Sequence, residues 1–82
     1  MANILYFGKL TDLAGCSRDT FDGAATLSQI IGHLSRQNAP LGTALIDRST
    51  RAAINLNLVE YGQDPLVQSD DELAFMPPVS GG

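Results

Sequence analysis

One amphipathic helix, in a chain whose other apolar segments suit strands, is the feature that most constrains the fold. Leu27, Ile30, Ile31 and Leu34 recur at the spacing of one helical stripe. Thr26, directly before them, is a residue type that commonly caps helix N-termini. Because the stripe covers one side only, it must be buried against another layer. The sequence therefore predicts a two-layer protein in which this helix packs on a sheet.

The other apolar segments predict the strands of that sheet. In chain order they are residues 4–7, a segment from residue 53, the possible short strand 66–67, and residues 73–76. Residues 17–22, with Asp22-Gly23 as a turn signal, can supply a return strand. Residues 9–14 suit a helical turn that ends at Gly15, a common helix-ending residue type. We therefore expect the first two strands to form a wide hairpin.

The middle of the chain is harder to interpret. Pro40, Gly42 and scattered apolar residues predict an irregular crossover over residues 38–50, with one helical turn around residues 41–46. The strict alternation that follows predicts a half-buried strand with Ile54, Leu56 and Leu58 on one face and Ala53, Asn55 and Asn57 on the other. The resulting element order is that of an α+β, β-grasp protein, a mixed sheet with one main helix packed on one face.

Size and charge limit the function classes. The chain has 82 residues, enough for one domain. Its net charge of −4, with only five Lys and Arg, lacks the basic footprint of a nucleic-acid-binding protein. No apolar run is long enough for a membrane span, and the N-terminus lacks a basic signal region. Cys16, the single cysteine, has no partner for an internal disulfide. We expect a cytoplasmic protein without a nucleic-acid or membrane partner.

The last six residues predict the working part of the molecule. After a domain over residues 1–76, the chain ends in a flexible Gly-Gly tail, Pro77-Pro78-Val79-Ser80-Gly81-Gly82. The prolines stiffen its base, and the glycines lack the Cβ that would block a narrow slot. Six extended residues reach roughly 20 Å. The sequence thus predicts that the Gly82 carboxylate is carried into a pocket of another protein. A frayed terminus without a role is the alternative.

The final strand and tail resemble a known family. The segment Asp71-Glu72-Leu73-Ala74-Phe75-Met76-Pro77-Pro78-Val79-Ser80-Gly81-Gly82 is similar to the ending of the MoaD-type small subunits of molybdopterin synthase, which are ubiquitin-like sulfur carriers. Weaker matches, Ala53-Ile54-Asn55 with Leu58-Val59 and Phe7 followed by Asp12-Leu13-Ala14-Gly15, fall in the family's order. Three residues depart from the pattern: Asp70 replaces a glycine, Thr11 an arginine and Met76 a frequent aromatic residue.

The resemblance implies a role in molybdenum cofactor biosynthesis. An E1-like, MoeB-type adenylyltransferase would use ATP to adenylate Gly82, and sulfur would then replace AMP to give a thiocarboxylate. The large, MoaE-type synthase subunit would receive residues 77–82, and the sulfur would pass to cyclic pyranopterin monophosphate to form the molybdopterin dithiolene. The chain would be a non-catalytic, sulfur-donating subunit of a heterotetramer, binding no cofactor or metal itself.

The resemblance also implies partner-docking residues at Phe7, Leu58 and Met76. For Phe7 and Leu58 the alternative is ordinary core packing, since apolar strand residues are usually buried. Three other functions stay open at this point. The chain could be a thiamine-pathway or other sulfur carrier, a ubiquitin-like modifier conjugated through Gly82 to lysine, or an interaction module with an inert tail.

Other chemistry-bearing residues suggest no catalytic site. His33 is expected on the flank of the helix, at the surface. Cys16 has no CxxC partner or neighbouring histidine, so we expect an inert thiol. The acidic residues 70–72 predict a solvated turn and not a metal site or an acid/base pair, because adjacent turn residues point in different directions. The glycines form neither GxGxxG nor a P-loop, so the chain alone is not expected to bind ATP.

Overall fold

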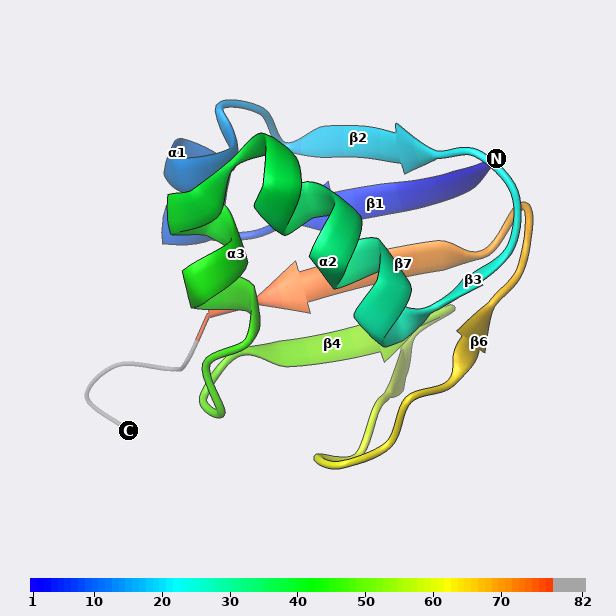
Figure 1. Cartoon of the computed structure of the whole chain (residues 1–82). Coiled ribbons are helices and arrows are strands. Elements are labelled where there is room, and N and C mark those ends of the chain that lie inside the picture. Colours follow the sequence, from blue (N-terminus) through cyan, green and yellow to red (C-terminus); the bar gives the residue numbers. More distant parts are fainter. Residues whose placement is uncertain (78–82) are drawn as a thin grey trace.

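The computed structural model describes residues 1–77 as ten helices and strands in two layers (Figure 1). In chain order they are β1 (Ala2–Tyr6), α1 (Lys9–Ala14), β2 (Arg18–Phe21), β3 (Ala25–Thr26), α2 (Leu27–Gln37), α3 (Ala39–Leu45), β4 (Arg51–Ile54), β5 (Asn57–Leu58), β6 (Leu66–Val67) and β7 (Glu72–Met76). The helices α2 and α3 cover one face of the main sheet. Within residues 1–77, no helix has the length and apolar character needed to cross a membrane.

The main sheet is mixed, and its strand order is β2-β1-β7-β4-β5. Its centre is a parallel pair formed by the first and last strands, in which Ile4 lies opposite Leu73. The β1–β2, β4–β7 and β4–β5 pairs are antiparallel, and β3 and β6 form a separate two-stranded sheet. This topology confirms the predicted β-grasp fold. It also places the end of β1 beside the end of β7, where the predicted tail begins.

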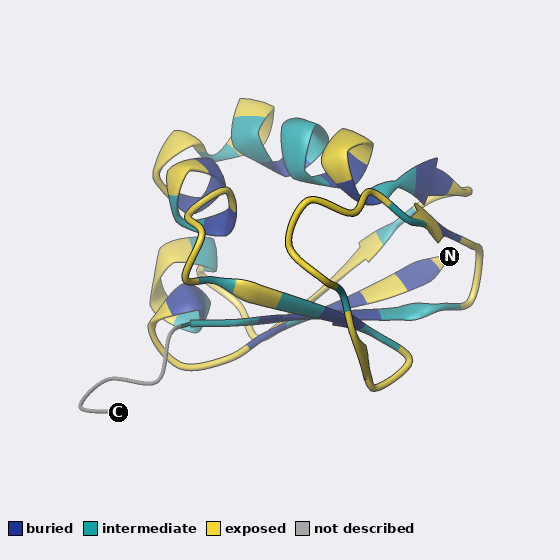
Figure 2. Cartoon of the chain, turned by 90° about the horizontal axis from the view of Figure 1, so that it is seen from below, coloured by how far each residue is buried: buried dark blue, intermediate teal, exposed yellow. Residues whose placement is uncertain are grey.

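The core lies between the sheet and the helices (Figure 2). Its largest fully buried side chains are Phe75, Ile4, Leu10, Ile30, Leu73 and Val67. The helix α2 forms as predicted, and its first turn carries a capping box: Thr26 Oγ1 accepts from the Gln29 N–H at 3.3 Å, and Gln29 Oε1 accepts from the Thr26 N–H at 2.9 Å. The cap satisfies donors that the helix itself leaves without partners.

The single strand predicted from residue 53 is wrong, because a hairpin occupies this segment. Asn55 (φ 50°) and Leu56 (φ 72°) both take left-handed backbone and turn the chain between β4 and β5. In the hairpin Leu58 pairs with Ala53, and cross-strand partners share a face. Leu58 therefore lies on the face of Ala53, whereas the uninterrupted alternation placed it with Ile54.

The crossover is more regular than the sequence predicted. The side chain of Asn38 accepts from the Leu41 N–H at 3.1 Å and caps α3, whose first turn holds Pro40. Gly42 permits close packing of α3 on α2, since a Cβ at this position would lie 2.8 Å from the Ser35 Cα. The sequence predicted only one turn here, because a seven-residue segment with a proline and a glycine has weak local helix signals. Packing against α2 stabilises the longer helix.

Candidate functional site

The predicted tail begins directly after the central strand of the sheet. Strand β7 lies between β1 and β4, ends at Met76, and is followed by the half-buried Pro77. Gly8 packs directly against this point, since a Cβ on Gly8 would lie 2.8 Å from the Pro77 Cγ. The base of the tail is thus fixed to the rigid part of the molecule. The predicted working group, Gly82, lies outside the described residues, as do Pro78, Val79, Ser80 and Gly81.

The three predicted docking residues share the sheet face that the helices leave uncovered. Tyr6 and Phe75 pair across the central strands and belong to the core, so their neighbours along each strand point to the opposite face. Phe7 continues the alternation beyond β1, because its N–H donates to the Phe75 carbonyl at 3.1 Å. Phe7 is 48% exposed, Leu58 is 60% exposed and Met76 is half-buried.

We call this surface the outer face and define it by its apolar members: Leu5, Phe7, Ala53, Leu58, Ala74 and Met76. Strand pairing joins them, because Leu5 lies opposite Ala74, Ala74 opposite Ala53, and Ala53 opposite Leu58. The exposure of Phe7 and Leu58 shows that neither is an ordinary core residue. The outer face therefore offers an apolar surface beside the base of the tail. Its contact with a partner stays a prediction.

Sequence reasoning missed part of the outer face. Leu5 could have been found, because alternation across residues 2–7 separates Ala2, Ile4 and Tyr6 from Leu5 and Phe7. Alternation placed Ala53 on the face opposite Ile54, but it did not join Ala53 to Leu5 or Phe7, and Ala74 was not singled out because a small apolar residue suits either face. Their shared position follows from the pairing of β4 with β7, which no local pattern specifies.

The residues that depart from the family pattern fit this fold. Asp70 takes φ 74°, the left-handed conformation that glycine adopts easily, and its carboxylate lies 3.6 Å from the Met1 amine. Asp71 accepts from the Asn55 side chain at 2.9 Å and from the Gln68 N–H at 2.8 Å. These bonds hold the pKa of Asp71 below its usual value. Thr11 donates through Oγ1 to the Tyr6 carbonyl at 3.1 Å. The acidic turn is thus a structural tie between the N-terminus and the hairpin.

A side groove of about 190 Å³ lies between the α3–β4 connection and the segment after β5. Arg48, Arg51, Asp47 and Tyr61 are among its lining residues. The Arg48 guanidinium lies 4.6 Å from the centre of the Tyr61 ring, which is a cation–π contact. The pKa of Asp47 is lowered because its carboxylate accepts hydrogen bonds from Ser49. Both charge signs line this groove, so it has no clear electrostatic preference.

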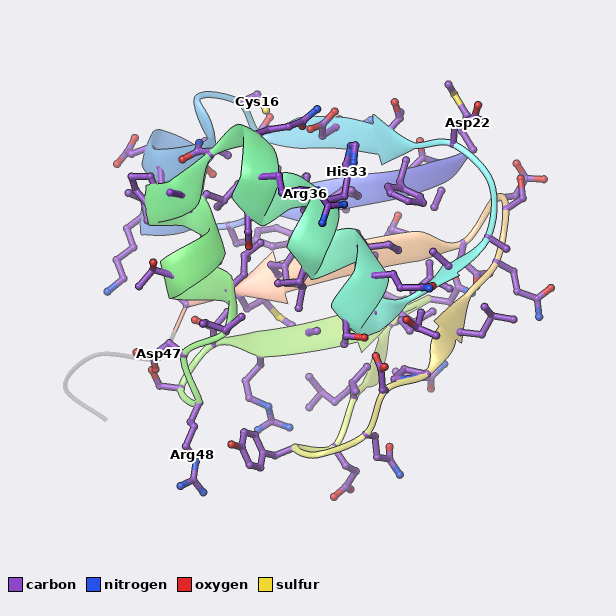
Figure 3. All side chains as sticks on the ribbon, in the orientation of Figure 1. Cys16, Asp22, His33, Arg36, Asp47 and Arg48 are labelled. Carbon is purple, nitrogen blue, oxygen red and sulfur yellow. The ribbon has the colours of Figure 1, made fainter. Side chains whose placement is uncertain are left out.

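The remaining reactive side chains are dispersed over the described part of the chain (Figure 3). Cys16 is exposed in the α1–β2 connection, away from Asp47 and Arg48 at the opposite side of the view. His33 is half-buried rather than fully at the surface, and its ring packs edge-to-face on Phe21 with 5.3 Å between centroids. Within residues 1–77 no hydrogen bond joins Cys16 to His33. The described residues provide a scaffold, an apolar outer face and a firmly held tail base.

A β-grasp domain whose central strand leads directly into the C-terminal segment defines a class of ubiquitin-like proteins. The chain belongs to the ThiS family, whose model matches residues 4–82. Over the full length of both chains it is 34% identical to the molybdopterin synthase sulfur carrier subunit of Escherichia coli.

Solved structures support the same fold. The small archaeal modifier protein 1 from Methanosarcina acetivorans has a TM-score of 0.85 at 22% identity, covering 99% of this chain and 95% of that chain. The small archaeal modifier protein 1 from Haloferax volcanii has a TM-score of 0.74 at 26% identity, covering 99% of this chain and 98% of that chain. The expected family and the expected fold are both confirmed.

Proposed function

We propose that this chain is the sulfur carrier subunit of a molybdopterin synthase. The observation that carries the proposal is the 34% identity to the named E. coli carrier, which extends over both chains completely. The fold supports it, because the predicted tail begins directly after the central strand β7, and Pro77 at its base lies against Gly8. A carrier in this family needs little more than a rigid body and a deliverable terminus.

The Gly82 carboxylate needs activation by another protein. With a pKa of about 3.5 it is ionised at neutral pH, and its delocalised charge resists nucleophilic attack. In the proposed reaction one carboxylate oxygen attacks the α-phosphate of ATP and pyrophosphate leaves. A sulfide-level sulfur from a donor then attacks the carbonyl carbon, and AMP leaves with the C–O bond electrons. The product is a C-terminal thiocarboxylate. An E1-like, MoeB-type enzyme would supply the nucleotide site and the ATP.

Sulfur donation then takes place in a partner. The large, MoaE-type subunit would cover the outer face and receive residues 77–82, and two subunits of each kind would form the heterotetramer. Docking converts sulfur transfer to cyclic pyranopterin monophosphate into a reaction within one complex, which raises the effective concentration of the thiocarboxylate. The general acids and bases would belong to the partner. We place the process in the cytoplasm, where ATP is available.

A second candidate is a protein modifier joined through Gly82 to lysine amines. The 26% identity to the Haloferax volcanii protein, whose name describes a modifier, favours it. The two functions predict different products. A modifier forms isopeptide adducts with other proteins, whereas a carrier keeps a free terminus that holds sulfur.

Intact-mass spectrometry tests the proposal. The full chain is incubated with the E1-like enzyme of the same organism, ATP and a sulfur donor, and then with the large subunit and the pterin substrate. We expect one terminal oxygen to be replaced by sulfur, and molybdopterin to form. Deletion of Gly82 should abolish both events and leave the melting temperature unchanged, because no core residue lies beyond Phe75 among the described residues.

Arg36→Ala is the matched control, since Arg36 is exposed on α2 in the helix layer and should retain full transfer. An unchanged mass for the wild-type chain with an active enzyme would refute the carrier function. Adducts on lysine in place of the thiocarboxylate would favour the modifier.

A further inference from the structure

Leu56 combines two unfavourable features. Its backbone has φ 72°, a region in which the Cβ of an L-residue crowds the following carbonyl. Its side chain is 87% exposed, the largest exposed fraction among the exposed large apolar residues of the described chain. Tight two-residue hairpin turns favour glycine at this position, because glycine takes positive φ without strain. A leucine here therefore gives the folded protein neither a relaxed turn nor a buried contact.

The position of this turn points to a role outside the fold. In Figure 2 the β4–β5 turn projects from the sheet on the side opposite the helices. Leu56 precedes Leu58 by two residues, and Leu58 belongs to the outer face. With Asn55 and Glu72, Leu56 lines a shallow hollow at the end of this face. Leu56 thus extends the apolar outer face beyond the sheet.

The distances suit a single partner. Arg51 lies opposite Met76, and Ile54 is three residues further along β4, so the turn begins about 10 Å from Met76 at about 3.3 Å per residue. A standard interface buries about 800 Å² on each partner, which corresponds to a footprint roughly 30 Å across. A protein that covers Phe7 and Met76 while it holds the tail would also reach Leu56.

We propose that Leu56 is a partner-contact residue that inserts into an apolar depression on the synthase large subunit. The inference rests on the proposed function and adds to it a second anchor, at the opposite end of the outer face from the tail. A second copy of this chain is a less suitable occupant, because each copy carries a net charge of −4 and two such copies repel each other. In the proposed complex the exposed Leu56 side chain gains the apolar contact that the free fold does not give it.

Leu56→Gly in the full-length chain tests the inference, because glycine should make the free protein more stable and its binding to the large subunit weaker. Relief of the turn should raise the melting temperature of the free protein by about 4 °C, the shift expected for a small gain in a domain of this size. Loss of the apolar anchor should raise the Kd for the large subunit about tenfold, measured by calorimetry. Leu56→Asn also accepts positive φ and should weaken binding to a similar extent, which separates lost contact from added flexibility.

Leu66→Ala is the matched control, since Leu66 is 55% exposed on β6, in the separate small sheet, and should leave the Kd unchanged. Equal affinity of Leu56→Gly and wild type would overturn the inference while leaving the carrier function intact. Failure of the wild-type chain to bind the large subunit would instead count against the proposed function. Wild-type dimers in sedimentation that disappear in Leu56→Gly would overturn the inference in favour of self-association.

Discussion

At the residue scale, Tyr6 stands out as a core residue with an unpaired polar atom. Its side chain is 3% exposed, and within residues 1–77 its hydroxyl finds no hydrogen-bond partner. Burial, together with the nearby Asp19 and Cys16, raises the pKa of Tyr6 well above its ordinary value. The ring itself packs well, stacked on Phe75 with 6.1 Å between centroids. The hydroxyl is therefore a local cost, while the aromatic body stabilises the core.

Tyr6→Phe should stabilise the protein. It removes a buried hydroxyl without a partner and keeps the ring, so we expect the free energy of unfolding at neutral pH to rise by about 1 kcal/mol. The raised pKa of Tyr6 contributes stability that is complete below the unfolded pKa of about 10 and is lost as pH rises toward the folded value. Tyr6→Phe should therefore lose less stability than wild type above about pH 10.

Urea titrations across this pH range measure both effects. Tyr61→Phe is the control, because Tyr61 is 71% exposed and its change should alter stability little. A clear loss of stability in Tyr6→Phe at neutral pH would show that the hydroxyl is paired in solution.

At the element scale, α2 and α3 differ in how their ends are specified. The capping box of α2 uses Thr26 and Gln29, which are three residues apart and form a local sequence signature. The cap of α3 uses Asn38, whose amide also donates to the Leu13 carbonyl at 2.8 Å. One cap is thus local, and the other also ties α3 to α1. This difference is consistent with the prediction of the start and the apolar stripe of α2, and of only one turn of α3.

Thr26→Ala should destabilise the protein through α2. Loss of the cap acceptor leaves the Gln29 N–H without its partner, and such changes usually cost about 1 kcal/mol of unfolding free energy. Chemical denaturation should show a lower midpoint with an unchanged slope. Thr43→Ala, inside α3, is the control and should cost less, since alanine has the higher helix propensity there. Equal losses in the two variants would contradict the role of the cap.

At the scale of the whole molecule, exposed carboxylates join segments that are distant in sequence. Asp64 accepts from the Ser28 N–H at 2.7 Å and from its hydroxyl at 2.6 Å, connecting the segment before β6 to the start of α2. Asp71 connects the final turn to the β4–β5 hairpin through Asn55. Hydrogen bonding to the charged form lowers the pKa of both carboxyls.

Acid should weaken these connections. A lowered folded pKa contributes stability that is present above the unfolded value of 3.8 and is lost as pH falls through the folded value. We expect the melting temperature to decline below about pH 4. The double variant Asp64→Asn, Asp71→Asn should begin with a lower melting temperature and show a flatter decline, measured by calorimetry. An equally steep decline in the double variant would assign the acid sensitivity to other carboxyls.

Much of the fold and the site could be predicted. Periodicity identified α2, apolar runs identified the first and last strands, and the turn signal Asp22-Gly23 indicated the return strand. Gly15 ended α1 as expected, with φ 77°. The family resemblance selected Phe7, Leu58 and Met76, which the fold places on one face. The hairpin turn at Asn55 and Leu56 was missed, because leucine gives no turn signal and the alternation of polar and apolar residues in the sequence runs through the turn without a break.

The sequence by itself determined the family and the α2 stripe, because these depend on residues that are neighbours along the chain. The tertiary structure alone decided that β1 pairs with β7 in parallel, that α3 packs on α2 through Gly42, and that the outer face extends to Leu56. Local periodicity states which residues share a face of one element. It does not state which distant element pairs with it, since that choice depends on the free energy of the whole packed core.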